Sequence, residues 1–503
     1  MRTDECYGEL LRRTREESLL SSCIDLLGWD EDTYLPAGGG EHRAAQMDLL
    51  AGLLHDRATD PRLGDLLAAV EGSGLTRDPD AVAAVNIREI RRAYDRDNRL
   101  PRALVKEFAR VTSLGEHHWA EARREANFRA FLPWLEKISV LAREQAEALG
   151  YRECPYDALL DLHDPGLTAA RVAEVFDALR RELIRLVNEL TYARRKPNVR
   201  VLRRSYPVER QRRFGLEAAA ALGFDFRRGR LDTTTHPFFS TLGPHDCRIT
   251  TRFDEHNVSD GLFAILHEAG HGLYEQGLPV EHHGTPAGEV MSLSLHESQA
   301  RLWENTVGRS RAFWVHFYPE ARELFREALW DVPLDEFHFA VNSVEPTFIR
   351  IQADEVTYNL HILVRFELER ALIRGDLKAA DVPGAWNEAY RHYLGIVPAN
   401  DADGCLQDGH WGSGMIGYFP TYTLGNLMAA QLYERAERDL GDPGRAFARG
   451  DFRPLLEWLR EQVYRHGGRY PAGRLIERVT GAKLNQRPLL EALRRKYVPL
   501  YGL

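Results

Sequence analysis

Two histidines and a glutamate stand at metal-site spacing near the middle of the chain. The segment LHEAGHGLYEQG, residues 266–277, contains His267, Glu268 and His271 in the order His-Glu-x-x-His. Residues four apart on a helix lie on one face, so both imidazoles can bind the same ion. The Glu268 carboxylate lies beside them, where it can take a proton from a water molecule that the ion activates. The segment therefore predicts two metal ligands and a general base.

The surrounding residues predict that this segment is a helix. Ser259 and Asp260 can each cap its start, and Gly277 and Pro279 end it. The apolar stripe between these ends consists of Leu262, Phe263, Ile265, Leu266, Ala269 and Leu273. One amphipathic helix is thus expected to carry both histidines.

A catalytic zinc ion usually has three protein ligands and a position for water, so a third ligand is needed. The segment SLSLHESQARLWEN, residues 292–305, has a helical pattern and offers Glu297, 26 residues after His271. Glycines and prolines before it allow an antiparallel return of the chain. His296 is the rival ligand, and because neighbouring side chains on a helix point about 100° apart, only one of the two is expected to bind the ion.

Two other structures would also account for these residues. A pair of helices with buried, hydrogen-bonded histidines would hold no metal. A di-iron carboxylate bundle uses Glu-x-x-His, which Glu268 and His271 match once, but such a bundle needs the motif twice. No other histidine of the chain has a glutamate three positions before it.

Helical periodicity dominates the elements that must position this site. Residues 101–150, 167–195 and 377–395 all place apolar side chains three and four apart. The segment 231–257 differs, because β-branched runs flank Gly243-Pro244 and predict a small hairpin or meander. We expect an all-α fold with a small β-sheet, in a single unit of residues 1–503, because no linker divides the chain.

The bulk composition excludes several classes of partner. The net charge of -9 argues against nucleic acid, which needs a clustered positive field. The first residues contain no apolar signal-peptide core, and no run approaches the ~18 apolar residues of a membrane span. Five scattered cysteines fit reduced thiols better than disulfides. We therefore expect a soluble, cytoplasmic protein that binds neither nucleic acid nor membrane.

Motifs along nearly the whole chain resemble the carboxypeptidase Taq family of metallopeptidases. The two segments with His267 and Glu297 occur in family order with further motifs. These are Trp29-Asp30, His236-Pro237-Phe238, Asp246-x-Arg248-x-Thr250, Ile349-Arg350-x-x-Ala353-Asp354, GCLQDGHW at 404–411 and GYFPTYTLGN at 417–426. Several motifs in order are far more specific than any one of them.

The resemblance implies a fold, an assembly and a ligand set. The implied fold is almost all-helical and similar to the neurolysin and angiotensin-converting-enzyme group, with the small sheet near the active site. Two lobes flank a deep groove, the catalytic core spans about 232–430, and the protein is usually a homodimer. Because the family's ligands are two histidines and the glutamate of His-Glu-Ser, the resemblance selects Glu297 over His296.

The resemblance also suggests which groups stabilise the negative oxygen of the tetrahedral intermediate. The segment HWGSGMIGYFPTY resembles the histidine-and-tyrosine loop of related helical zinc peptidases. His410, Tyr418 and Tyr422 are the candidates, although aromatic residues near glycines are often simply packed together.

A carboxypeptidase must also hold the terminal carboxylate of its substrate, and a guanidinium does so with two parallel hydrogen bonds. Arg350 is expected near the start of a long helix, on one face with Asp354, Tyr358 and His361. A surface pair of Arg350 with Asp354 is the plainer interpretation. Arg248 is the substitute for the substrate role.

Together these observations predict a metallocarboxypeptidase that removes C-terminal residues from peptides with broad specificity. Imidazole and carboxylate ligands favour zinc as the ion, and cobalt and manganese are the alternatives. An oligopeptide metalloendopeptidase of the same fold is the nearest alternative. A non-catalytic helical metal-binding protein is the second alternative. Glu268 argues against this alternative, because a structural ion needs no adjacent base.

Overall fold

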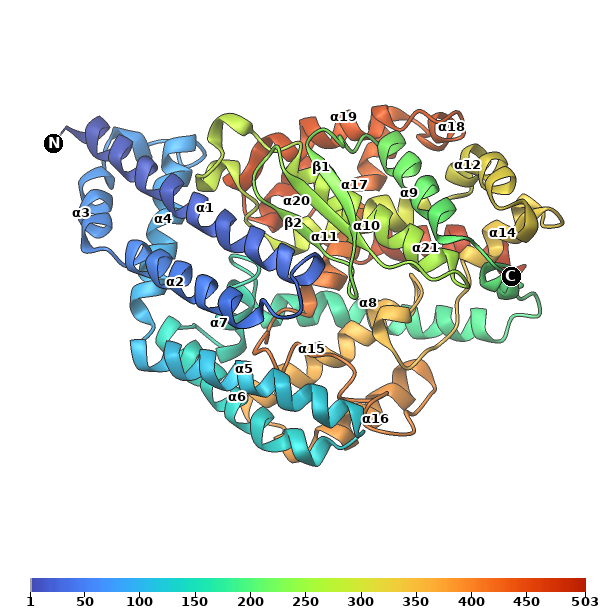
Figure 1. Ribbon diagram of the computed structural model, residues 1–503, viewed down its shortest axis with the longest axis horizontal. Coiled ribbons are helices and arrows are strands. Elements are labelled where there is room, and N and C mark those ends of the chain that lie inside the picture. The colour runs from blue at the N-terminus through green and yellow to red at the C-terminus, as the bar shows by residue number, and fades with distance from the viewer. Residues whose placement is uncertain (1) are drawn as a thin grey trace. The chain divides into compact units, whose positions relative to one another are not determined.

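The structure is a computed structural model that describes residues 2–503, and the chain forms two compact units. Of the described residues, unit 1 comprises 2–98, 198–341 and 432–483, and unit 2 comprises 99–197, 342–431 and 484–503. Both are built mainly from helices (Figure 1). This confirms the predicted mostly helical fold with a small sheet. The groove between two lobes and the catalytic core at 232–430 stay predictions.

Unit 1 contains the sheet and most of the helices. Its helices are α1 Thr3–Thr33, α2 Gly40–Ala58, α3 Pro61–Val70, α4 Val82–Arg99, α9 Val208–Leu222, α10 Val258–Glu275, α11 Leu293–Arg301, α12 Arg311–Leu324, α13 Arg326–Leu329, α14 Leu334–Val341, α18 Gly444–Phe447, α19 Arg453–Gln462 and α20 Ala472–Thr480. The helix α17, Pro420–Leu440, crosses from unit 2 into unit 1.

Three short strands form one sheet in unit 1. They are β1 Gly229–Thr233, β2 Phe239–Thr241 and β3 Cys247–Thr251, in the order β1-β3-β2. The antiparallel pair β2 and β3 is the hairpin predicted around Gly243, whose φ of 136° explains the glycine at the turn. The parallel pairing of β1 with β3 was not predicted. The strand β3 packs against α10, which also lies along α11 and α9 (Figure 1).

The helix α10 begins earlier than its sequence suggested. Its first residue is Val258 and its N-cap is Asn257, so Ser259 and Asp260 lie inside the first turn and do not cap it. The prediction of a cap at either residue was therefore wrong. The end at Glu275, just before Gly277, agrees with the predicted stop.

Unit 2 is a helical bundle around α15. Its helices are α5 Arg102–Arg124, α6 Phe128–Leu149, α7 Pro155–Asp161, α8 Ala169–Thr191, α15 Tyr358–Arg374, α16 Val382–Leu394 and α21 Arg487–Tyr501. The helix α15 packs against α6, α7, α8 and α16, so most of its residues are buried. It nevertheless carries Arg365 and Glu369, both completely buried. Charges buried in this way must be satisfied by specific partners.

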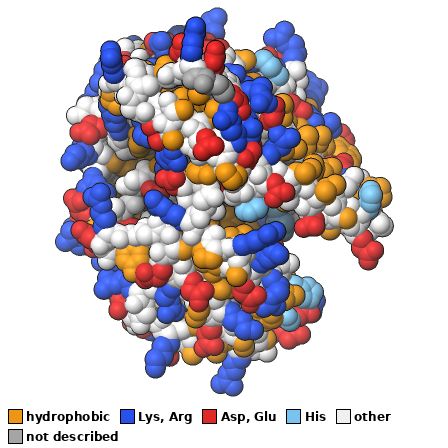
Figure 2. Space-filling model, turned by 90° about the vertical axis from the view of Figure 1, so that its left-hand side faces the viewer, with side chains coloured by type: hydrophobic (Ala, Val, Ile, Leu, Met, Phe, Trp, Pro, Cys, Tyr) orange, Lys and Arg blue, Asp and Glu red, His pale blue; other side chains and the backbone are white. Residues whose placement is uncertain are grey.

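Surface charge and cysteine pairing agree with the composition. On the face that Figure 2 shows, basic and acidic side chains are interspersed. All five cysteines are free thiols. Among residues 2–503, no helix combines the length and the apolar character that crossing a bilayer requires.

Candidate active site

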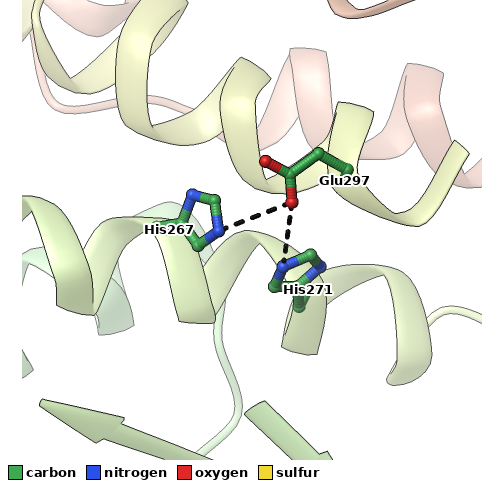
Figure 3. Close-up of side chains that lie close together, drawn as sticks. All are labelled: His267, His271 and Glu297. Carbon is green, nitrogen blue, oxygen red and sulfur yellow. Dashed lines mark ion pairs between the residues drawn. The ribbon is translucent and has the colours of Figure 1, made fainter. Parts of the chain in front are cut away.

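Two adjacent helices of unit 1 bring His267, His271 and Glu297 together (Figure 3). The helix α10 carries both histidines, and α11 carries the glutamate. Each Nε2 atom lies 3.7 Å from Oε2 of Glu297, and the three ligand atoms all lie within 4.8 Å of one another. We call these three residues the metal cluster. It is the only such group of His, Cys, Asp or Glu in residues 2–503.

A glycine allows the two helices to come this close. A Cβ atom on Gly270 would lie 2.6 Å from the Cα atom of Ala300 and 2.8 Å from the carbonyl oxygen of Gln299. Because real Cβ atoms do not approach backbone atoms so closely, no other residue fits at this crossing without moving α11. Gly270, between the two histidines, therefore helps to bring Glu297 to the imidazoles.

The donor atoms of the metal cluster fit a divalent ion. Ligands that bind one zinc ion tetrahedrally at about 2.0–2.2 Å lie about 3.3–3.6 Å apart, close to the 3.7 Å separations of this cluster. Two imidazoles and one carboxylate are also a common donor set of catalytic sites that leave one position for water.

Further groups orient the cluster from outside. Nδ1 of His267 donates a hydrogen bond to Oε2 of Glu304 at 2.9 Å, which leaves Nε2 free to face Glu297. Glu304 lies in a π-helical turn, Leu302–Gly308, that continues α11. Nε of Arg301 donates to Oε1 of Glu297 at 2.6 Å, so the other oxygen points toward the imidazoles.

The electrostatics of the cluster differ between its two histidines. Burial alone would lower the pKa of His267, but the carboxylates of Glu297 and Glu304 raise it above its ordinary value. Burial, with His296 and His267 nearby, holds the pKa of His271 well below its ordinary value. Burial would raise the pKa of Glu304, yet Arg301 and His267 hold it well below the usual carboxyl range.

Glu268 is a buried carboxyl group on the same helix. Burial raises its pKa to about 7, partly opposed by His267 and supported by Glu297. A group with a pKa near the working pH can both accept and release a proton. A dication bound at the metal cluster would lower this pKa again.

His296 points away from the cluster's centre. Its ring stacks on that of His271, with 4.3 Å between centroids and an interplanar angle of 14°. Its Nε2 atom lies 3.2 Å from Oε1 of Glu275. The structure thus brings Glu297, and not His296, to the two Nε2 atoms.

A second group of predicted residues lies in unit 2. Arg350, His410, Tyr418 and Tyr422 lie close to one another, and we call them the arginine-tyrosine cluster. Nε2 of His410 is 3.3 Å from Oη of Tyr422. The guanidinium of Arg350 lies 5.0 Å from the Tyr422 ring. Burial, with Arg350 and Arg365 nearby, lowers the pKa of His410 to about 4 although Asp408 opposes this, so its imidazole is neutral at neutral pH.

The surroundings of Arg350 differ from the prediction. Arg350 lies in a 3₁₀ turn, Arg350–Gln352, before α15 begins at Tyr358, so the predicted shared helix face was wrong. Asp354 instead accepts hydrogen bonds from the backbone N–H groups of Val356 and Thr357, and the predicted surface pair with Arg350 was also wrong. The Tyr358 hydroxyl nevertheless accepts a bond from Nη1 of Arg350 at 2.9 Å.

The partner of Arg350 is Asp408. Nε and Nη2 of the buried Arg350 donate to Oδ1 of Asp408 at 3.1 and 2.8 Å. Nε of the buried Arg365 donates to Oδ2 at 2.6 Å. Burial would raise the pKa of Asp408, but the two arginines hold it well below the usual carboxyl range. With three of its five N–H groups engaged, Arg350 keeps one on each terminal nitrogen.

Arg248 stands in unit 1, on β3. Its Nε and Nη2 atoms form a fork with Asp246 at 2.9 and 2.8 Å. Its guanidinium stacks over Trp29 at 4.1 Å from the ring centroid. The Asp-x-Arg motif therefore forms a local ion pair, and the Trp29 motif packs against it.

Sequence reasoning did not assign several of these supporting groups, among them Glu304, Asp408 and Arg365. Glu304 stands seven residues after Glu297, a spacing that places both on one helix face and that could have identified it. Asp408 lies inside the recognised GCLQDGHW motif, and its acidic side chain was the available signal. No neighbouring residue indicated the role of Arg365, because its partner Asp408 lies 43 residues away in the sequence.

Known proteins match this chain over nearly its entire length. The family model of the carboxypeptidase Taq (M32) metallopeptidases matches residues 9–497. The thermostable carboxypeptidase 1 of Thermus thermophilus is 50% identical over 100% of both chains. Carboxypeptidase 1 of Bacillus subtilis is 37% identical over 99% of this chain and 98% of its own. The crystal structure of the M32 carboxypeptidase from Deinococcus radiodurans is 43% identical, covers 99% of this chain and 100% of that one, and has a TM-score of 0.96.

The motifs predicted this relationship from the sequence, and a family model across the chain, a full-length relative and a near-identical fold agree with it. The chain belongs to the carboxypeptidase Taq (M32) metallopeptidase family.

Proposed function

We propose that this protein removes C-terminal residues from peptides with His267, His271 and Glu297 as the ligands of one divalent ion. Members of its family are metal-dependent carboxypeptidases, a class of peptide hydrolase. The observation that carries the site assignment is the meeting of the three ligand atoms within 4.8 Å beside the buried Glu268.

Glu268 acts as the proton carrier of the reaction. When bound, a divalent ion supplies Lewis acidity toward the scissile carbonyl and toward the attacking water. Glu268 takes a proton from that water and passes it to the nitrogen of the leaving amino acid as the C–N bond breaks. Its burial on the helix that carries both histidine ligands supports this role.

His410, Tyr418 and Tyr422 are the proposed donors to the negative oxygen of the tetrahedral intermediate. A neutral imidazole and two phenols can all donate a hydrogen bond. The low pKa of His410 supports a neutral donor at neutral pH. The loss of one such donor typically costs on the order of 10²–10³ in rate.

Arg350 is the proposed binding group for the terminal carboxylate of the substrate. It keeps one N–H group on each terminal nitrogen, the number that a bidentate contact requires. Arg248 is the substitute for this role, and its fork with Asp246 occupies one side of its guanidinium.

The edge strand β2 is the proposed contact for the substrate backbone. It lies at one side of the sheet, and its Phe239 ring lies 5.9 Å from that of His271. Hydrogen bonds between the strand and the substrate backbone depend little on the substrate's side chains, which would give broad specificity.

The finer proposals concern the ion, the assembly and the compartment. Zinc is the proposed ion because two imidazoles and one carboxylate suit it, with cobalt and manganese as alternatives. The free cysteines support a reducing, cytoplasmic compartment. The family resemblance supports a homodimer, and the interspersed surface charges of Figure 2 favour peptides over nucleic acid as the partner.

The test compares a short peptide with a free C-terminus against the same peptide amidated, each with and without a chelator. Mass spectrometry should show stepwise loss of C-terminal residues from the free peptide only, and the chelator should abolish this loss. Equal cleavage of both peptides at internal bonds would instead identify an oligopeptide endopeptidase. Ion binding without cleavage of either peptide would identify a non-catalytic metal-binding protein.

A further inference from the structure

A completely buried carboxylate, Glu369, lies on α15 behind the arginine-tyrosine cluster. It accepts three hydrogen bonds. Two come from the irregular segment 411–417, and the third comes from α7. None of the residue roles assigned above uses this group.

The two bonds from the segment arise at its two ends. The indole Nε1 of Trp411 donates to Oε1 of Glu369 at 2.8 Å. The backbone N–H of Gly417 donates to Oε2 at 3.0 Å. Trp411 directly follows His410, and Gly417 directly precedes Tyr418. One carboxylate therefore holds the residues next to two of the proposed oxyanion donors.

The helix α7 fixes the same end of the segment from the other side. Its Tyr156 hydroxyl donates to Oε2 of Glu369 at 2.6 Å. Gly417 has a φ of 86°, and a Cβ atom there would lie 2.8 Å from the carbonyl carbon and oxygen of Leu159. Gly417 is thus held tightly between α7 and the carboxylate, in a conformation that favours glycine.

Only a carboxylate satisfies this arrangement. Both of its oxygens accept hydrogen bonds, so it can bind the two ends of the segment and Tyr156 at once. A glutamine of the same size has a single acceptor oxygen, and its amide group would face one of the N–H donors. Burial raises the pKa of Glu369 to about 7, whereas the bonds from Tyr156, Gly417 and Trp411 favour the charged form.

We propose that Glu369 is a positioning residue of the hydrolytic reaction, which sets the places of His410 and Tyr418 by tying Trp411 and Gly417 together. This inference rests on the oxyanion roles proposed above for those two residues. Glu369 is completely buried, so it acts through the segment and does not contact the substrate.

The first test is the variant Glu369→Gln, assayed for kcat and KM on a C-terminally free peptide. We expect kcat to fall on the order of 10–100-fold while KM stays within about twofold, because misplaced donors weaken binding of the transition state only. A purely structural role would lower the melting temperature without this split between kcat and KM.

A matched control and a graded variant separate positioning from general damage. Glu367→Gln makes the same change on the same helix and disturbs bonds from Tyr393 and Arg180, away from the segment. Tyr156→Phe removes the third bond to Glu369 but leaves both bonds to the segment. Glu367→Gln should keep kcat within about twofold of wild type even where it lowers stability. Tyr156→Phe weakens one support of Glu369, so it should lower kcat less than Glu369→Gln does.

Nitrogen-15 spectra of the tryptophan indoles test the same contact without catalysis. Trp411→Phe assigns the Trp411 signal, and Glu369→Gln should shift that signal because a charge-assisted hydrogen bond is lost. Trp411→Phe also serves as the second variant if Glu369→Gln does not fold. It frees one end of the segment, so it should lower kcat less than Glu369→Gln would, with KM unchanged.

The inference is overturned if Glu369→Gln shifts the Trp411 signal but leaves kcat at the wild-type value, or if Glu367→Gln lowers kcat equally. Failure of the proposed function would look different. In that case the wild-type protein itself would not cleave the free peptide, while the indole shift in Glu369→Gln would still report the contact.

Discussion

The metal cluster and the arginine-tyrosine cluster are held by different kinds of structure. His267, His271 and Glu297 all project from α10 and α11, which pack directly against each other. Arg350 lies in a 3₁₀ turn, and His410 and Tyr418 lie in an irregular segment between α16 and α17. Helices position the first cluster, whereas side-chain bonds to buried carboxylates position most of the second.

This difference determines where each cluster is vulnerable. The backbone hydrogen bonds of α10 keep the two histidines on one face whatever their neighbours do. The irregular segment has turn bonds, such as that from the Met415 N–H to the His410 carbonyl, but no helical ladder, so it depends also on Asp408 and on Glu369. Loss of one supporting carboxylate should therefore damage the arginine-tyrosine cluster more than the metal cluster.

The largest expected effect is on the chemistry beside the metal cluster. Glu268→Gln should lower kcat on the order of 10⁴-fold, because the proposed proton carrier is lost. The bound ion should remain, since Glu268 is not among the three ligand residues. Atomic absorption measures whether the ion is retained, and a peptide hydrolysis assay measures the fall in kcat. Retained activity, or loss of the ion, would contradict the proposed role.

The next effect tests the dependence of the second cluster on its carboxylates. Asp408→Asn removes the carboxylate that pairs with both buried arginines, Arg350 and Arg365, which should destabilise the fold by about 3–5 kcal/mol. Urea unfolding measures this loss. Asp376→Asn is the matched control, because it breaks only an exposed pair with Arg374 and should cost less than about 1 kcal/mol. Equal losses in the two variants would refute the comparison.

The ion pairs of Asp408 with its two arginines also predict that the stability of the fold depends on pH. The folded-state pKa of Asp408 is depressed, so its stabilisation is complete above the ordinary carboxyl pKa of about 3.9 and disappears as pH falls from there toward the depressed value. Asp408→Asn should remove this part of the acid sensitivity. Unfolding curves of both proteins measured between neutral and acidic pH would reveal a flatter dependence in the variant.

A smaller effect should distinguish the two tyrosines. The Tyr422 hydroxyl contacts His410, whereas the Tyr418 ring packs against His163. We expect Tyr422→Phe to lower kcat by about 10²-fold, as for the loss of one oxyanion donor, and Tyr418→Phe to lower it less. Measured kcat values in the reverse order would assign the stronger donor to Tyr418.

The smallest effect should be the loss of support around the metal cluster. Glu304→Gln removes the charged partner of His267, and such partners typically contribute about 10–100-fold in metal affinity. Competition with a chelator measures zinc binding directly. Glu461→Gln, which changes only an exposed partner of Arg465, should bind zinc like wild type. Unchanged affinity in Glu304→Gln would show that helix packing alone holds His267.

Prediction from the sequence succeeded for elements with a regular local pattern of residues. The spacing of His267 and His271 and the apolar stripe around them predicted α10, and β-branched runs predicted the β2 and β3 hairpin. The helix start was missed by two or three residues because Asn257 precedes both predicted caps. The surroundings of Arg350 were wrong because a 3₁₀ turn interrupts the apparent helical pattern.

The sequence by itself determined what depends on neighbours along the chain: the helical fold, the pair of histidines on one face, the adjacent Glu268 and the family. Only the tertiary structure decided which distant groups meet outside the ligand set, such as Glu304 at His267 and Asp408 rather than Asp354 at Arg350. The physical reason is that backbone geometry fixes contacts within a helical turn. Contacts across tens of residues depend instead on how closely whole elements pack, as Gly270 against Ala300 shows.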